Sequence, residues 1–430
     1  MQPKSLPGRR GNILVLIFCC IGILGLLIRG IYLIVTIIMG FNPGNISNLS
    51  APLLGALAML FCAALLLPAT YYSIKRLAGK EILPGDIRPI KIWHALAIIS
   101  IWIFVVILGA VLVGLFDYGW LLAAPMFLLG ICLPIFTLIW VGAGGLPAGS
   151  RLRTWFVIGF GMVGGTVASV LLEYLLLGIA LVVVGLLAST SPELRAILDQ
   201  VQNQVLNAKG GDIQSLLTVL APYLTNPIVI MSILVFAAVI GPLIEETLKP
   251  AVIWFLGKRL RTPAEGFVLG ILCGAGFAML EGLMAASGAT QMWGFALAGR
   301  AAASLMHITC SGLLGWGIAS VQLQKRYGRL ILVYLVSISI HGLWNGSAIV
   351  AVYGALRTMV QGTQTDFLSM FFVVVGLITL ILEFFLMLAA LPLMNYILRR
   401  TAALRVDGAP SDIISPARKS ESEAELWIGS

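Results

Sequence analysis

Ten long apolar runs dominate this chain of 430 residues, and they restrict the folds that are open to it. A helix that crosses the hydrocarbon core of a bilayer needs about 20 mostly apolar residues, and every run is at least that long. Apolar residues make up 60% of the sequence and charged residues only 10%, which is too few to cover a water-facing surface. We therefore predict an all-α polytopic membrane protein with about ten transmembrane helices in a bundle. The predicted spans are residues 12–40, 51–73, 92–116, 119–143, 155–187, 227–257, 266–288, 293–321, 329–356 and 367–398.

The basic residues predict how these helices are oriented. The sequence has 27 Lys and Arg against 18 Asp and Glu, and most of the basic residues lie in short clusters after the even-numbered runs. Because cytoplasmic loops of membrane proteins carry an excess of Lys and Arg, we expect a multi-pass protein of the cell membrane with both termini in the cytoplasm. The lipid bilayer then accounts for the net charge of +9, and no nucleic-acid partner is expected.

The runs divide the chain into four predicted regions. Residues 1–150 form an N-terminal four-helix membrane region, and residues 151–226 hold the fifth span and a long external loop. Residues 227–400 form a helix core that carries most of the polar side chains, and residues 401–430 form a disordered cytoplasmic tail. Within the external loop, apolar residues recur at helical spacing over 194–206, which predicts an amphipathic helix.

Four neighbouring runs of the helix core carry a dense set of ionisable and amide side chains. A charge at the centre of a spanning helix costs roughly 2.5–3.5 kcal/mol on insertion scales, so such residues need a partner or a function. Depth in the membrane follows from the rise of about 1.5 Å per helical residue. On this measure, four side chains lie roughly 18–22 Å from the same membrane face: those of Glu245, Glu281, His307 and His341. We therefore predict that they meet in one polar layer near the middle of the bilayer. The set consists of Glu245, Glu246 and Lys249 in the sixth run, Glu281 in the seventh, His307 in the eighth, and His341 and Asn345 in the ninth.

The spacing within these runs favours acid–base chemistry. Glu245 and Glu246 lie four and three residues before Lys249, so the ammonium group can offset one carboxylate. Two adjacent carboxyl groups in a low-dielectric site are not expected to be ionised together, and a charged Glu beside a neutral one forms an acid–base pair. His341 and Asn345 lie on one helix face, where Asn345 can orient the imidazole or both can donate to a developing oxyanion.

These side chains favour a hydrolytic reaction with activated water inside the membrane. Glu245 would act as the general base, with His307 orienting the water molecule. His341 and Asn345 would stabilise the tetrahedral oxyanion.

The remaining members of the set would support this chemistry. Glu246 and Lys249 would tune the base, and Glu281 would hold a histidine or a water molecule. The enzyme can be of glutamic type or of metallo type, and in the second case two histidines and a carboxylate would bind Zn²⁺, although the sequence has no HExxH motif. The candidate metal ligands are His307, His341, Glu245 and Glu281.

Two other functions fit the same polar layer. It can carry protons or cations in a transporter, although the polar residues lie in one half of the chain and no inverted repeat is evident. It can also bind single-span proteins in a non-catalytic scaffold. We expect the other charged residues within the spans to pair between helices, with Arg300 also able to act as an outer support seven residues before His307. These residues are Arg29, Glu173, Arg300 and Glu383.

The order of the motifs resembles the PrsW family of intramembrane proteases. The strings EETLK and GFAMLEGLMA, a helix with His307 and the string HGLWN follow one another on separate apolar runs, over about residues 225–400. This family shares a superfamily with the CAAX prenyl endopeptidases and the bacteriocin-processing membrane proteases. The resemblance implies a membrane-embedded peptidase that cuts membrane-bound polypeptides, with residues 227–400 as its catalytic helix core.

The resemblance also implies roles for single positions. Relatives often have Asn after the second-helix Glu, where this chain has Gly282. The family is often described as metallopeptidases, which implies Zn²⁺ as a cofactor. The first four spans and residues 188–226 have no counterpart in the minimal family core. By position, Glu245 matches the first catalytic Glu with Glu246 beside it and Lys249 closing the motif, Glu281 matches the second-helix acid, His307 matches the next histidine, and His341 with Asn345 matches the H-x-x-x-N/D element.

Overall fold

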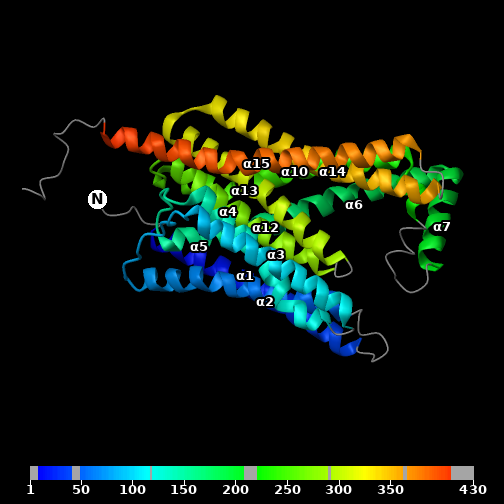
Figure 1. Ribbon diagram of the computed structural model, residues 1–430, viewed down its shortest axis with the longest axis horizontal. Helices are drawn as coiled ribbons and strands as arrows, with labels where there is room; N and C mark the ends of the chain where they lie inside the picture. Colours follow the sequence, from blue (N-terminus) through cyan, green and yellow to red (C-terminus); the bar gives the residue numbers. More distant parts are fainter. Residues whose placement is uncertain are drawn as a thin grey trace, which may run out of the picture.

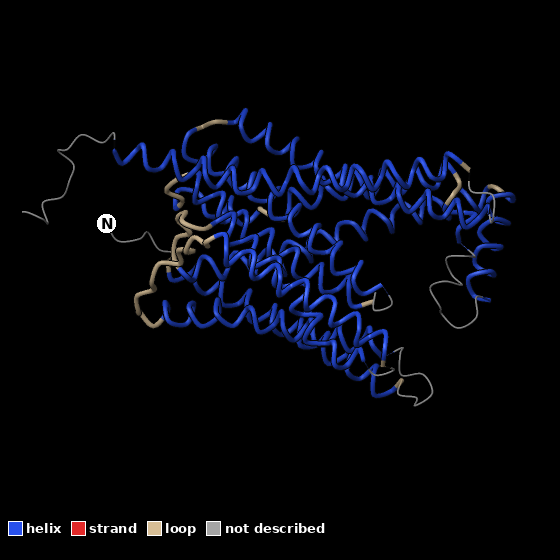
Figure 2. Tube along the Cα trace, in the orientation of Figure 1, coloured by secondary structure: helices blue, strands red, loops and turns tan. Residues whose placement is uncertain are grey.

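The computed structural model describes residues 8–40, 49–116, 119–207, 220–288, 292–361 and 366–407. Ten helical segments in this part of the chain are long and apolar enough to cross a membrane, one for each predicted run. The prediction of an all-α polytopic protein is therefore confirmed. Figure 2 shows that helices fill the structure and that the loops gather toward its two ends.

The first four spans are single helices, whereas the fifth and sixth are interrupted. α1 (Arg9–Met39), α2 (Ser50–Leu77), α3 (Ile92–Leu115) and α4 (Gly119–Ala143) form the first four spans. The fifth span consists of α5 (Arg151–Gly159), the π-helical η2 (Phe160–Gly165) and α6 (Thr166–Thr190). The sixth consists of α9 (Pro227–Val235), the π-helical η4 (Phe236–Ile240), α10 (Gly241–Leu248), α11 (Ala251–Leu256) and the 3₁₀ turn η5 (Gly257–Arg259). The last four spans are α12 (Pro263–Ser287), α13 (Trp293–Gln324), α14 (Tyr327–Gln361) and α15 (Phe367–Asp407).

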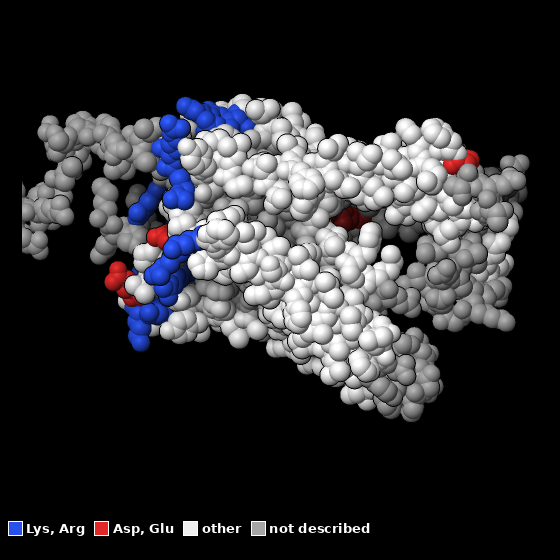
Figure 3. All heavy atoms as spheres, viewed as in Figure 1, with Lys and Arg blue, Asp and Glu red and all other residues white. Residues whose placement is uncertain are grey.

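The amphipathic helix predicted in the external loop is present as α7 (Pro192–Asn207). It lies at the end of the bundle opposite to the Lys and Arg side chains (Figures 1 and 3). At the basic end, α1 begins and α15 ends, and α15 continues to Asp407. The rest of the predicted tail lies outside the described residues.

Local sequence signals set the start of the helices that support the polar core. Thr262 caps α12, because its hydroxyl accepts a hydrogen bond from the backbone N–H of Glu265 at 3.1 Å, and Pro263 takes the first helical position. The carboxylate of Glu265 then pairs with Arg153 at the start of α5, and both side chains are buried. This ion pair joins the fifth and seventh spans at the basic end of the bundle.

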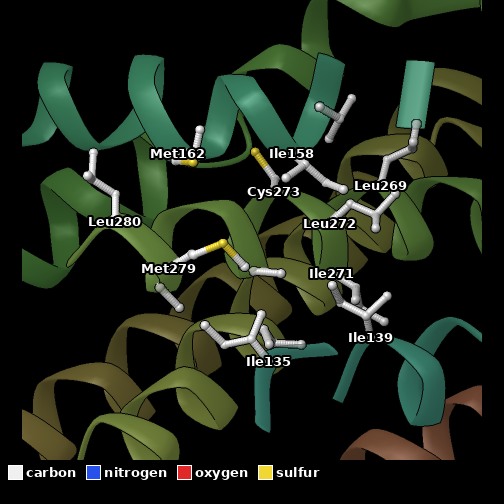
Figure 4. Packing of buried hydrophobic residues seen from close by; sticks show 14 of the residues in the cluster. Ile135, Ile139, Ile158, Met162, Leu269, Ile271, Leu272, Cys273, Met279 and Leu280 are labelled. Carbon is white, nitrogen blue, oxygen red and sulfur yellow. The ribbon is translucent and has the colours of Figure 1, made fainter. Parts of the chain in front are cut away.

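α12 lies at the centre of the hydrophobic core. Figure 4 shows its side chains, such as Leu272 and Met279, between Ile135 of α4 and Met162 of η2. On another face α12 meets α13 closely at Gly274, where a Cβ atom would lie 2.5 Å from the backbone oxygen of His307. α12 and α13 are mostly buried, whereas the most apolar stretch of the fifth span is not buried at all. Two of the helices that carry the polar motifs therefore lie in the core, whereas the fifth span lies at its exposed edge.

Candidate active site

The predicted polar residues meet in the structure. They come from α10, α12, α13 and α14, which are adjacent helices in the sequence and pack against one another around α13. One potential ligand atom from each of Glu245, His307 and His341 lies within 4.8 Å of the other two. The prediction that Glu245, His307 and His341 meet is thus confirmed.

Lys249 is the centre of this cluster. Its side chain is fully buried, and its ammonium Nζ donates a hydrogen bond to Glu246 Oε1 at 2.9 Å. Nζ also lies 2.7 Å from Glu245 Oε2 and 2.8 Å from His307 Nδ1. The ring of Phe277 covers the ammonium at 4.1 Å from the ring centroid. All three protons of the ammonium group therefore have an acceptor nearby, which the sequence spacing indicated only for the two carboxylates.

Each histidine contacts a different carboxylate. His341 Nδ1 forms a 2.8 Å hydrogen bond with Glu246 Oε1, and its Nε2 lies 3.8 Å from Glu245 Oε2. His307 Nε2 lies 2.8 Å from Glu281 Oε2. The two imidazole rings meet edge to face, with their centroids 5.1 Å apart. Each imidazole ring is thus held in place by contacts with a carboxylate and with the other ring.

The hydrogen-bond network assigns the ring protons. An ammonium group only donates, so His307 Nδ1 accepts from Lys249 and the proton of the neutral ring is on Nε2, facing Glu281. An ionised carboxylate only accepts, so His341 Nδ1 carries a proton and donates to Glu246. The free lone pair of His341 is then on Nε2, on the side of Glu245.

Asn345 has a different partner from the ones we predicted. Its amide Nδ2 donates to the backbone oxygen of Ala237 in η4 at 2.8 Å. The π-helical turn changes the normal i to i−4 pairing and exposes backbone oxygens to side chains of a neighbouring helix. α14 approaches η4 closely beside this bond, because a Cβ atom at Gly342 would lie 2.3 Å from the oxygen of Ala238. Asn345 therefore fixes the π-helical segment that leads into α10.

Within the part of the chain that the structure describes, the interhelical pairing predicted for the other charged residues within the spans is found for one of them and not for the rest. Arg300 pairs with Glu281 at 2.7 Å, as predicted. Arg29 lies over the ring of Tyr32, and no carboxylate in the described part of the chain forms an ion pair with it. The pairing predicted for Glu173 and Glu383 is wrong: among the described residues, Glu173 Oε1 and both oxygens of Glu383 are buried without a hydrogen-bond partner. The prediction failed because depth along a helix does not tell which way a side chain points around it.

The donor set fits a transition-metal ion. Two histidines and one glutamate are the protein ligands of many catalytic zinc sites, and these three donors already converge. His341 Nε2 has a free lone pair, whereas His307 would have to exchange its contact with Lys249 or Glu281. Glu281, the fourth candidate ligand, is not in this group, and its carboxylate contacts His307 and Arg300.

Within the described residues, ten apolar helical segments together with a cluster of glutamate, histidine and lysine side chains define a polytopic membrane protein with a candidate hydrolytic centre. Residues 152–380, more than half of the chain, match the PrsW family of intramembrane metalloproteases. The chain therefore belongs to this family. No curated protein and no solved structure matches it.

The match begins in α5 and so extends beyond the region that carries the motifs. The matched range includes the fifth span and runs through residues 188–226. The structure gives the reason. η2 packs against the sixth span at the centre of the cluster, where a Cβ atom at Gly165 would lie 3.4 Å from Cα of Lys249. The fifth span supports the site although it carries none of the motifs.

Proposed function

We propose that this chain hydrolyses peptide bonds of membrane-bound polypeptides with water activated by Glu245. The observation that carries the proposal is the convergence of Glu245, His307 and His341 within 4.8 Å in a member of an intramembrane protease family. A structural ion pair between Glu245 and Lys249 would not require two histidines at the same place.

The water molecule would bind between Glu245 Oε2 and His341 Nε2. These atoms are 3.8 Å apart, too far for a direct hydrogen bond and close enough to be bridged by one water molecule. Glu245 accepts a proton from this water as the hydroxyl attacks the carbonyl carbon, and returns it to the leaving amine. His341 Nε2, which carries the free lone pair, accepts a hydrogen bond from the same water and so orients its oxygen for the attack.

The surrounding side chains hold these two groups in place. The ammonium of Lys249 lies 2.7 Å from Glu245 Oε2 and holds this carboxyl group in place, while Glu246 fixes the tautomer of His341 through Nδ1. Glu281 supports His307 and thereby Lys249, whose ammonium group faces the other ring nitrogen. Asn345 acts one helix away, by fixing η4 ahead of the glutamate pair.

If the enzyme uses a metal, the ligands would be Glu245, His307 and His341. A zinc ion at this place would act as a Lewis acid on the substrate carbonyl and make water more acidic. Metal analysis of the purified protein, together with inhibition by a chelator, distinguishes the metallo type from the glutamic type.

We also propose an orientation for the protein in the cell membrane. The Lys and Arg side chains at one end of the bundle would face the cytoplasm, together with both termini. The site would then be reached from within the bilayer or from the opposite side, where α7 lies.

The proposed activity is tested by comparing wild type with Glu245→Gln in proteoliposomes that also contain solubilised host membrane proteins. Mass spectrometry of new peptide N-termini should reveal cleavage products with wild type that are absent with Glu245→Gln. The matched control is Glu81→Gln, since Glu81 is an exposed carboxylate in the loop after α2 and should leave the products unchanged.

Identical sets of N-termini with wild type and Glu245→Gln would refute the peptidase proposal. An ion-flux measurement on the same proteoliposomes covers the main alternative. Proton or cation flux that depends on Glu245, in the absence of any cleavage, would favour a transporter.

A further inference from the structure

Glu173 is a carboxylate close to the candidate site that takes no part in the proposed reaction. It lies on α6, a helix whose neighbouring side chains, such as Leu171 and Tyr174, are well exposed toward lipid. Glu173 itself is half-buried, and its Oε1 is buried without a hydrogen-bond partner in the described part of the chain. A carboxylate is unfavourable in this apolar setting unless a cation or a donor meets it.

The carboxylate points to the edge of the proposed active site. A Cβ atom at Gly241 would lie 4.0 Å from Glu173 Oε1, and Gly241 is one helical turn before Glu245 on the same face of α10. Glu173 interacts electrostatically with Glu245, Lys249 and Glu281. It therefore lies about one turn from the base, toward the end of the bundle at which α7 lies.

The two basic side chains that line the site already form ion pairs with other carboxylates. Lys249 contacts Glu245, Glu246 and His307, and Arg300 pairs with Glu281. Among the described residues, neither of these two basic side chains forms an ion pair with Glu173. A Lys or Arg side chain of another molecule would therefore meet no competing cation at this carboxyl group.

Glu173 lies at an open edge of the fold. Its side chain is only half-buried although α6 packs against α10, and the most apolar stretch of the fifth span is not buried. Figure 3 shows acidic atoms deep in an opening between the helices. A polypeptide that enters the site from the bilayer beside α6 would pass Glu173 before it reaches Glu245.

We propose that Glu173 is a specificity-determining residue that binds a Lys or Arg side chain of the substrate next to the bond to be cut. The inference rests on the proposed peptidase function and deepens it, because it defines the substrate class as polypeptides with a basic residue close to the cleaved bond. The long Lys and Arg side chains can place their charge on Glu173 while their apolar stems remain in lipid. The basic residue lies on the substrate segment that faces the α7 end of the bundle.

The test uses the full-length protein in proteoliposomes and synthetic single-span peptides that contain one cleaved sequence from the N-terminal survey. Each peptide carries a single substitution, to Lys, Met or Glu, at one of the four positions on either side of the cleaved bond. The peptides are otherwise identical. With wild type, kcat/KM for the best Lys peptide should exceed that for its Met counterpart by about tenfold or more, as for a hydrogen bond to a charged group.

Variants at position 173 separate binding of the cation from a structural role. Glu173→Gln should cut the Lys and Met peptides at similar rates, and Glu173→Lys should prefer the Glu peptide. Loss of structure cannot create that reversed preference. The control is Glu383→Gln on α15, since Glu383 also has no hydrogen-bond partner among the described residues but is only 6% exposed, and it should keep the preference for Lys.

The possible failures can be told apart. If wild type cuts no peptide and yields no new N-termini, the peptidase function itself is refuted. If wild type cuts the peptides without preferring Lys at any position, or if Glu173→Gln keeps the preference, Glu173 does not bind a substrate cation and the peptidase proposal is unaffected. Peptide binding to Glu245→Gln and to the double variant with Glu173→Gln, measured by fluorescence anisotropy, checks the same preference without turnover.

Discussion

Replacing Lys249 with Met tests whether the cluster is a set of charges that depend on one another. Lys249 is fully buried, and its ammonium lies within 2.9 Å of Glu245, Glu246 and His307. Met has a similar volume and no charge, so Lys249→Met removes the cation and leaves the carboxylates. Removing one partner of a buried ion pair costs about 3–5 kcal/mol because the other charge remains buried.

The structure indicates which carboxylate dominates this cost. The side chain of Glu245 is 16% exposed and can gain some hydration, whereas Glu246 is fully buried and keeps only its hydrogen bond to His341. Lys249→Met should therefore lower the free energy of unfolding by about 3–5 kcal/mol. Adding Glu246→Gln removes the stranded charge and should recover at least half of that loss.

The assay is unfolding of the purified protein in mixed micelles with increasing SDS. A thiol-reactive dye reports the transition, since Cys19, Cys62, Cys132, Cys273 and Cys310 are buried in the fold. Cys273 is a sensitive probe of the cluster, because its Sγ donates to the backbone oxygen of Lys249 at 2.7 Å.

The matched control for this prediction is Lys80→Met, which changes an exposed lysine in the loop after α2 and should leave the transition unchanged. If Lys249→Met lowered the free energy of unfolding by less than about 1 kcal/mol, the reasoning would be contradicted, because leaving a buried charge without its partner costs more than that. So would a double variant with Glu246→Gln that is less stable than the single one.

Two further predictions concern the contacts that hold the helices of the site. Asn345→Asp should lower the melting temperature in detergent and the cleavage rate more than Asn345→Ala, because Asp brings an acceptor against the oxygen of Ala237, and loss of the donor alone costs about 1–3 kcal/mol; equal effects would contradict the donor role. Gly274→Ala should cost about 1–3 kcal/mol and slow cleavage, because its Cβ would press on the backbone of His307, whereas Gly178→Ala on α6, with no atom within 4 Å, should have no effect.

The spans and their number could be predicted from the sequence for a physical reason. In lipid every backbone polar group needs an internal partner, so an apolar run of sufficient length becomes a helix whatever surrounds it. The bounds predicted for the runs at 92–116 and 293–321 therefore agree with those of α3 and α13 to within a few residues. The π-helical segments η2 and η4 could not be predicted, because they depend on contacts with neighbouring helices, such as the bond from Asn345 to Ala237.

The candidate site was predictable in depth and not in rotation. Rise per residue fixes how far a side chain lies from the membrane face, and this was enough to bring Glu245, His307 and His341 together. It does not fix the direction in which a side chain points around its helix. For that reason the sequence predicts a role in the reaction for Asn345 and an interhelical pair for Glu173. In the structure Asn345 donates to the backbone of Ala237, and Glu173 Oε1 has no hydrogen-bond partner among the described residues.

The arrangement of buried and lipid-facing helices explains why a charged site can exist here at all. α12 and α13 are buried and carry Glu281 and His307, so these side chains are held by a rigid core. α10 contacts this core on one side and the lipid-facing α6 on the other, so the two glutamates lie where the packing changes from dense to open. A site enclosed by the core would exclude the substrate, and a site on the lipid surface would lose its buried ion pairs. The boundary between them is where a chain of this family can hold charges in order and still admit a polypeptide from the membrane.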